Sequence, residues 1–144
     1  MRTHSPIQWG RDALAALASE VAVIVVLILI TTTYRFLLAP GKSAADYQAF
    51  SDLAGYYFAP PAAGLAAFFG ALWATRKLSS GFLVNGTLVG VFGVLLTGGF
   101  FFVTKPENRL MYVVSFVLRI LGGYLGGVLA QRISARRSLS PLPA

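Results

Sequence analysis

The stretch "FVLRILGGYLGGVLAQR", residues 116–132, decides how the chain folds. It is apolar over most of its length, contains two pairs of glycines in the pattern GGxxGG, and ends on a basic residue. Near its start stands Arg119, a charged side chain inside a run that is otherwise typical of a membrane-buried helix. A charge at the centre of a bilayer costs at least about 2.5–3.5 kcal/mol, so Arg119 requires an acceptor.

The composition of the whole chain indicates a membrane protein. Of its 144 residues, 56% are hydrophobic and only 12% are charged, whereas about 25% of the residues of a soluble domain are charged. So little polar surface cannot coat a water-soluble globule, and we therefore expect the lipid bilayer to surround the chain. One compact domain is expected to cover residues 1–144.

Four apolar runs are each close to the roughly 20 residues that a helix needs to cross a hydrocarbon core. An isolated strand would leave its backbone groups unpaired in lipid, so each run is predicted to be a helix. The expected fold is an all-α bundle of four transmembrane helices, at about residues 21–38, 57–75, 82–103 and 110–133. Residues 1–12 are expected to form a polar N-terminal segment, and residues 134–144 a mobile tail.

The connection between the first two runs, residues 39–56, is longer than the other loops. Phe50, Leu53 and Tyr57 recur at helical spacing, and Asp46 and Asp52 lie off that face. This pattern predicts a short amphipathic helix lying on the outer surface of the membrane.

The distribution of Lys and Arg predicts the orientation, because basic residues gather on the cytoplasmic side of membrane proteins. With both termini inside, three of these residues fall in the outer loops, namely Lys42, Lys105 and Arg109, and seven fall inside, namely Arg2, Arg11, Arg76, Lys77, Arg132, Arg136 and Arg137. We therefore expect both termini on the inner side of a bacterial cytoplasmic membrane. The same clustering accounts for the net charge of +7, so no nucleic-acid partner is predicted.

Small residues form stripes along the last two predicted helices. The glycines that we predict to pack helices together are Gly86, Gly90 and Gly93 in the third helix and Gly122, Gly123, Gly126 and Gly127 in the fourth. In lipid, helices associate through close backbone contact, which small residues permit. The stripes either pack the helices of one bundle together or place one helix against a second subunit.

Arg119 lies on the same helical face as Ser115 and the glycines, so we expect it to point into the bundle or at a partner. The nearest acid by depth is Glu20, and a buried pair between the two would tie the first helix to the fourth. The alternative acceptors are backbone carbonyls, a lipid headgroup, an anionic substrate, or the side chains of Thr31, Thr32 and Asn85. Glu20 has the alternative of an interfacial acid beside Arg11, and Asn85 that of a hydrogen bond between helices.

No pattern in the sequence predicts catalysis, a metal site or a cofactor. The chain has no cysteine, and its single histidine, His4, lies in the N-terminal segment, which argues against thiolate, imidazole and triad chemistry in the bundle. The predicted function is that of a non-enzymatic accessory subunit that forms a homo-oligomer or joins a larger membrane complex. The alternative is a small oligomeric transporter or channel with Glu20 and Arg119 in its path and Asn85 as a further contact.

Overall fold

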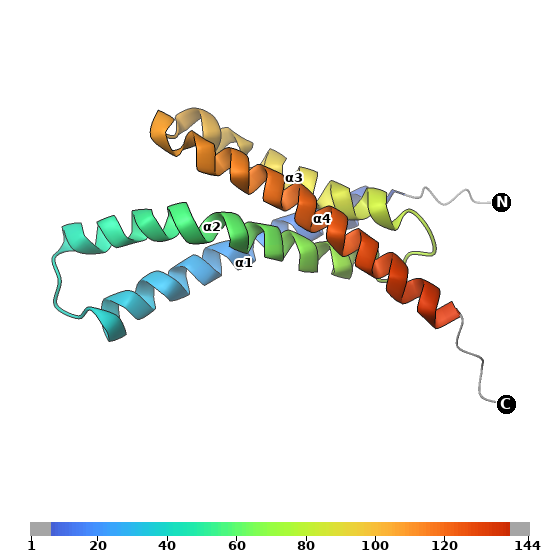
Figure 1. Cartoon of the computed structure of the whole chain (residues 1–144), viewed down its shortest axis with the longest axis horizontal. Coiled ribbons are helices and arrows are strands. Elements are labelled where there is room, and N and C mark those ends of the chain that lie inside the picture. The colour runs from blue at the N-terminus through green and yellow to red at the C-terminus, as the bar shows by residue number, and fades with distance from the viewer. Residues whose placement is uncertain (1–6, 139–144) are drawn as a thin grey trace.

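The computed structural model describes residues 7–138, and four long helices account for most of that segment (Figure 1). The helices are α1 (Trp9–Thr33), α2 (Ala44–Thr75), α3 (Phe82–Val103) and α4 (Arg109–Ser138). A π-helical turn, η1 (Tyr34–Leu38), extends α1, and a 3₁₀ turn, η2 (Pro106–Asn108), precedes α4. All four helices are long and apolar enough to cross a membrane. The predicted all-α architecture of an integral membrane protein is therefore confirmed.

The helices form two hairpins, α1–α2 and α3–α4, that cross each other (Figure 1). The start of α1, the end of α4 and the loop 76–81 lie at one end, which we call the proximal end. The loops 39–43 and 104–108 lie at the opposite, distal end. The hairpins are in contact over their proximal and central parts, and their distal parts diverge. α2 and α4 both run from the distal to the proximal end, so they point in the same direction where they cross.

α1 begins at Trp9, well before the predicted boundary at residue 21. The predicted polar segment 1–12 included Asp12, but Asp12 is fully buried. The buried face of α1 has small and polar residues at helical spacing, namely Asp12, Ala15, Ala16, Ser19 and Val23. This face packs into the bundle, so Asp12 lies within α1 and does not mark the point where the helix begins.

α2 begins at Ala44 and runs without interruption to Thr75, so residues 44–56 belong to the same helix as the second predicted span. A capping box starts it: Ser43 Oγ accepts from the Asp46 backbone N–H at 3.2 Å, and Asp46 accepts from the Ser43 backbone N–H at 3.2 Å. Such reciprocal bonds satisfy two of the free donors at a helix start. Residues 44–56 are helical as the first part of α2 and not as the separate surface helix that was predicted, and Pro60 and Pro61 lie inside α2.

The remaining boundaries agree more closely with the sequence. α3 spans the predicted residues 82–103. α4 continues to Ser138, so residues 134–138 are helical where a mobile tail was expected. Residues 1–6 of the predicted polar segment and residues 139–144 of the predicted tail lie outside the described residues.

The GGxxGG pattern places α4 between α2 and α3. The first glycine of each adjacent pair lies against α2, and the second lies against α3. A Cβ atom on Gly126 would lie 2.5 Å from the Phe68 carbonyl oxygen of α2, and one on Gly127 would lie 2.6 Å from the Phe82 carbonyl oxygen of α3. Gly122 lies against Gly64 of α2, while Gly123 lies against Gly86 and Gly90 of α3. These glycines therefore pack the helices of one chain, at separations that leave no room for a side chain.

Alanines pack α1 against α2 within the first hairpin, and Val89 of α3 joins them there. The buried cluster near the proximal end consists of small side chains around one valine, namely Ala15, Ala16, Ala71, Ala74 and Val89. On α1, Ser19 Oγ lies 2.9 Å from the Ala66 carbonyl oxygen of α2, opposite Gly70. Small residues let backbones approach closely, which is the main attraction between helices in lipid.

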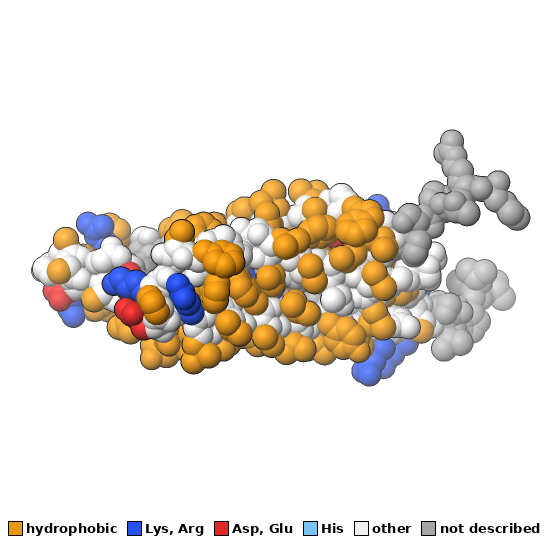
Figure 2. Space-filling model, turned by 90° about the horizontal axis from the view of Figure 1, so that it is seen from above, with side chains coloured by type: hydrophobic (Ala, Val, Ile, Leu, Met, Phe, Trp, Pro, Cys, Tyr) orange, Lys and Arg blue, Asp and Glu red, His pale blue; other side chains and the backbone are white. Residues whose placement is uncertain are grey.

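The surface of the bundle suits a bilayer. On the face that Figure 2 shows, hydrophobic side chains dominate the band between the two ends, and most charged side chains gather toward the ends. At the proximal end, Arg11 donates to the Trp73 carbonyl oxygen at 2.8 Å, and Arg11 and Arg76 both lie over the Trp73 ring. Tryptophan and arginine are typical of the membrane–water interface, so the composition of this cluster suits such an edge.

Substituting Gly126 by alanine should destabilise the bundle by about 1–3 kcal/mol, because the new methyl group would meet Phe68 and Ala71. The matched control is Gly99→Ala in α3, where a Cβ would meet no atom within 4 Å. Thermal unfolding in detergent measures both variants. If Gly126→Ala were as stable as the control, the close contact between α2 and α4 would be refuted.

Candidate functional site

The centre of the bundle contains the charged pair that the sequence suggested. Arg119 Nε donates to Glu20 Oε1 at 2.7 Å, and a second guanidinium nitrogen, Nη2, donates to Glu20 Oε2 at 2.8 Å. The side chains are only 8% and 15% exposed, respectively. Such parallel double contacts are the strongest geometry that an arginine and a carboxylate form.

A third donor of the guanidinium is also used. Arg119 Nη1 donates to the hydroxyl of Ser115, one turn earlier in α4. Each nitrogen of the Arg119 guanidinium therefore has an acceptor inside the chain. The charge is neutralised and hydrogen-bonded, which is the condition under which a buried ion pair is tolerated.

The pair lies near the middle of the apolar lengths of α1 and α4. Along α1, Glu20 is about 14 Å from Arg11, and along α4, Arg119 is about 20 Å from Arg132, at ~1.5 Å per residue. Half of a hydrocarbon core is about 15 Å. The double contact with Arg119 therefore holds Glu20 inside the bundle rather than beside Arg11.

Glycines of α3 make the space that the pair occupies. A Cβ on Gly93 would lie 3.1 Å from Glu20 Oε1 and 3.2 Å from Arg119 Cδ. One turn away, Gly90 lies directly against the backbone of Arg119 and Ile120. α3 thus forms a flat wall along which a carboxylate from α1 and a guanidinium from α4 meet.

Asn85 lies apart from this pair and joins two helix starts. Its side chain is fully buried. Its Oδ1 accepts from the Gln8 backbone N–H at 2.7 Å, just before α1, and its Nδ2 donates to the Gly81 carbonyl oxygen at 2.8 Å, just before α3. Gly81 has a left-handed φ of 74°, a conformation that favours glycine. Asn85 therefore anchors the start of α1 to the turn that precedes α3.

Thr31 and Thr32 are not part of the site. Thr31 Oγ1 donates to the Leu27 carbonyl oxygen of its own helix at 2.9 Å. Both threonines line a pocket at the distal end, between α1 and α2. The structure thus brings Glu20 and Arg119 together and leaves the other suggested acceptors elsewhere.

Asp12 is the buried acid that the sequence reasoning missed. Its side chain is fully buried, and neither carboxylate oxygen has a hydrogen-bond partner within residues 7–138. Its position two turns before Glu20, on the same face as Ala15, Ala16 and Ser19, was a signal that could have identified it. Ser115 was placed on the face of Arg119 but was not recognised as its acceptor.

The chemistry available to these groups is narrow. Glu20 and Arg119 satisfy each other and expose little surface, so neither is free to act on a ligand without breaking the pair. Within residues 7–138, no group of three His, Asp or Glu side chains is placed to hold a metal ion. Asp12 is the acidic group of the buried α1 face that has no partner within the described chain.

Comparison of the chain with protein-family models, with curated proteins and with solved structures finds no match. The geometry and burial of these residues are therefore the evidence on function.

Replacing one member of the Glu20–Arg119 pair should destabilise the bundle far more than replacing both members together. Glu20→Leu or Arg119→Leu alone should lower the unfolding free energy by about 3–5 kcal/mol, since each leaves a buried charge without its partner. The double variant should recover most of that loss. Chemical unfolding in mild detergent measures the three variants.

The control for this cycle combines Glu20→Leu with Arg109→Leu, because Arg109 lies at the exposed distal end over Phe101. Those two effects should simply add. If Glu20→Leu and Arg119→Leu also added, the two side chains would not be coupled.

Proposed function

We propose that the chain is a non-enzymatic accessory subunit of a membrane assembly, whose partner helices pack against its distal half. The partner is either a second copy or a helix of a larger complex. We further propose that both termini face the cytoplasm across a bacterial inner membrane, as the excess of Lys and Arg on that side favours. The proximal end, with Arg11, Arg76 and Trp73, is then the inner one.

The observation that supports this proposal best is a contrast among the glycines. Except for Gly10 at the start of α1, those in the central and proximal bundle lie against neighbouring helices of the same chain, and a Cβ on Gly64, Gly86 or Gly126 would collide or touch. A Cβ on Gly55, Gly98 or Gly99, in the distal parts of α2 and α3, would meet nothing within 4 Å. Small residues on an uncovered membrane face offer another helix a close approach.

The shape of the bundle agrees with this contrast. The two hairpins diverge toward the distal end (Figure 1), and no residue of α1 or η1 beyond Val23 is buried. Ile28 and Leu29 are 56% and 60% exposed. The distal half thus presents apolar helix surfaces and open glycines to lipid or to a partner, whereas the proximal half is closed by its own packing.

The closed state of the central pair also favours an accessory role over a ligand path. Both carboxylate oxygens of Glu20 are held by Arg119, and the third guanidinium nitrogen is held by Ser115. A substrate that used these groups would have to displace contacts that stabilise the bundle. The pair is therefore better suited to fixing α1 against α4.

The test is purification of the tagged chain from its native membrane in mild detergent, with mass identification of co-purifying chains and measurement of the oligomeric state. Gly98→Leu should remove the associated chain or the oligomer and leave the unfolding free energy within about 0.5 kcal/mol, as is usual for a surface site. Gly10→Leu is the control, because it is equally open but lies at the proximal end. A monomer without co-purifying chains would refute the proposal.

A second candidate, a small transporter or channel, is favoured by Asp12 alone. A buried carboxyl without a hydrogen-bond partner is costly in a membrane bundle, and such groups often mark proton or cation pathways. If the chain transports protons, Asp12→Asn should abolish proton flux into liposomes that contain the purified protein. Asp46→Asn, in the exposed capping box, should not. Absence of flux in the unmodified protein, or flux that Asp12→Asn leaves unchanged, would remove this candidate.

A further inference from the structure

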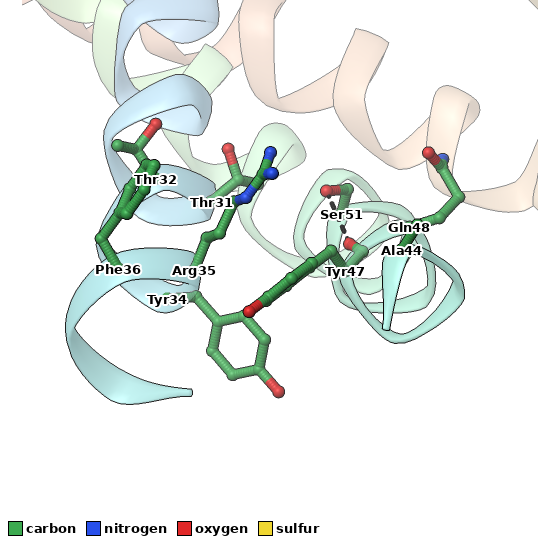
Figure 3. A pocket seen from close by; sticks show the side chains of 9 residues that line it. All are labelled: Thr31, Thr32, Tyr34, Arg35, Phe36, Ala44, Tyr47, Gln48 and Ser51. Carbon is green, nitrogen blue, oxygen red and sulfur yellow. Dashed lines mark hydrogen bonds between the residues drawn. The ribbon is translucent and has the colours of Figure 1, made fainter. Parts of the chain in front are cut away.

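A polar pocket lies at the distal end, between the last turns of α1 and the first turns of α2. Its volume is about 330 Å³. The residues that matter for its chemistry are Thr31, Tyr34, Arg35, Tyr47, Gln48 and Ser51. Figure 3 shows the Arg35 guanidinium on the side of α1 that faces α2, between the hydroxyls of Thr31 and Ser51.

Arg35 is the charged residue of the pocket lining, and it has no carboxylate partner within residues 7–138. Its guanidinium carbon lies 5.2 Å from the Tyr47 ring centre and 5.6 Å from that of Phe36. The two nearby acids are engaged elsewhere: Asp46 accepts from Ser43, and Asp52 accepts from Gln48 Nε2 at 2.9 Å. The rings thus position the guanidinium, while its N–H donors stay available to an anion.

The hydroxyls around Arg35 complement it by offering oxygen atoms rather than hydrogens. The hydroxyl proton of Thr31 is donated to the Leu27 carbonyl oxygen, and that of Ser51 to the Tyr47 carbonyl oxygen at 2.9 Å. Their oxygens can still accept. The pocket therefore combines a cation that suits an anionic group with acceptors that suit neighbouring O–H or N–H donors.

Tyr47 and Tyr34 hold this end of the hairpin together. The Tyr47 hydroxyl donates to the Ala39 carbonyl oxygen at 2.9 Å and accepts from the Lys42 backbone N–H at 3.1 Å. Tyr34 stacks on Phe50 of α2, with ring centres 3.6 Å apart. These contacts fix the loop and the two helix ends, so the pocket walls come from well-connected residues.

The depth of the pocket matches that of lipid headgroups. From Arg11, beside Trp73, Thr31 is about 30 Å and Arg35 about 36 Å along the helix, at ~1.5 Å per residue. The hydrocarbon core is about 30 Å thick, so these residues lie at its far edge. One turn below them, Ile28 and Leu29 are exposed and can lie beside acyl chains.

We propose that this pocket binds the phosphate group of a phospholipid, with the planar guanidinium of Arg35 donating to the phosphate oxygens. Arginine suits this contact because its fork of N–H donors matches two oxygens at once. The hydroxyls of Thr31 and Ser51 then accept from donors of the headgroup, and the acyl chains lie along the exposed apolar residues of α1. The site is formed within one hairpin, so it does not depend on the proposed partner contact.

The test uses the full chain, purified in detergent and stripped of lipid, with native mass spectrometry to count and rank bound lipids. The probes are phosphatidylglycerol, a glucosyl diacylglycerol with the same acyl chains but no phosphate, and inorganic phosphate. Phosphatidylglycerol should bind more tightly than the glycolipid. Arg35→Gln should weaken its binding by about tenfold, as expected for the loss of a charged hydrogen bond.

Arg109→Gln is the matched control, since Arg109 is also an exposed distal arginine over an aromatic ring. It should bind phosphatidylglycerol as the unmodified chain does. Unchanged binding by Arg35→Gln, or equal binding of the glycolipid, would overturn the proposal. Inorganic phosphate that competes as strongly as the lipid would assign the pocket to a soluble anion and overturn the lipid assignment. Circular dichroism of each variant ensures that a loss of binding is not a loss of fold.

Discussion

A buried guanidinium at the centre of an apolar helix bundle is the constraint on which the rest of this structure depends. Arg119 cannot remain without acceptors in hydrocarbon, and the bundle provides them with the carboxylate of Glu20 and the hydroxyl of Ser115. To bring the Glu20 carboxylate to Arg119, α1 must lie within side-chain reach of α4. The small residues on both helices permit this approach. Asn85 in turn holds the start of α1, and so fixes how far along the bundle α1 and its Glu20 lie.

The glycines follow from the same constraint. An ion pair between α1 and α4 needs a wall without side chains, and Gly93 provides it. Gly90, Gly123 and their neighbours bring α3 and α4 close enough for that wall to be in the right place. With little hydrophobic drive between helices in lipid, dispersion contacts between close backbones and one strong polar contact have to hold the bundle together.

The sequence was most informative where one physical signal acted alone. Four apolar runs predicted the four helices, and α3, which has no charged residue, was predicted with its observed bounds. The pairing of Glu20 with Arg119 followed from depth and from the scarcity of acids. The start of α1 was predicted wrongly because Asp12 was assigned to the polar N-terminal segment, although it shares its helical face with Ala15, Ala16 and Ser19. The start of α2 was missed because the capping box of Ser43 and Asp46 begins the helix well ahead of the apolar run at residues 57–75. Which face each glycine of the GGxxGG pattern covers also depended on the crossing of the hairpins.

The proximal and distal halves thus differ in kind: the first is closed by its own glycines and charges, and the second offers open glycines, apolar helix surface and a cationic pocket. The central claim is that Arg119 is neutralised inside the chain. Solid-state NMR of the protein in phospholipid bilayers tests it directly, by dipolar coupling from the labelled Arg119 guanidinium nitrogens to the labelled Glu20 carboxyl carbon and to lipid phosphorus. The account predicts strong coupling to Glu20 and none to phosphorus. Coupling to phosphorus without coupling to Glu20 would show an arginine stretched to a headgroup and would contradict it.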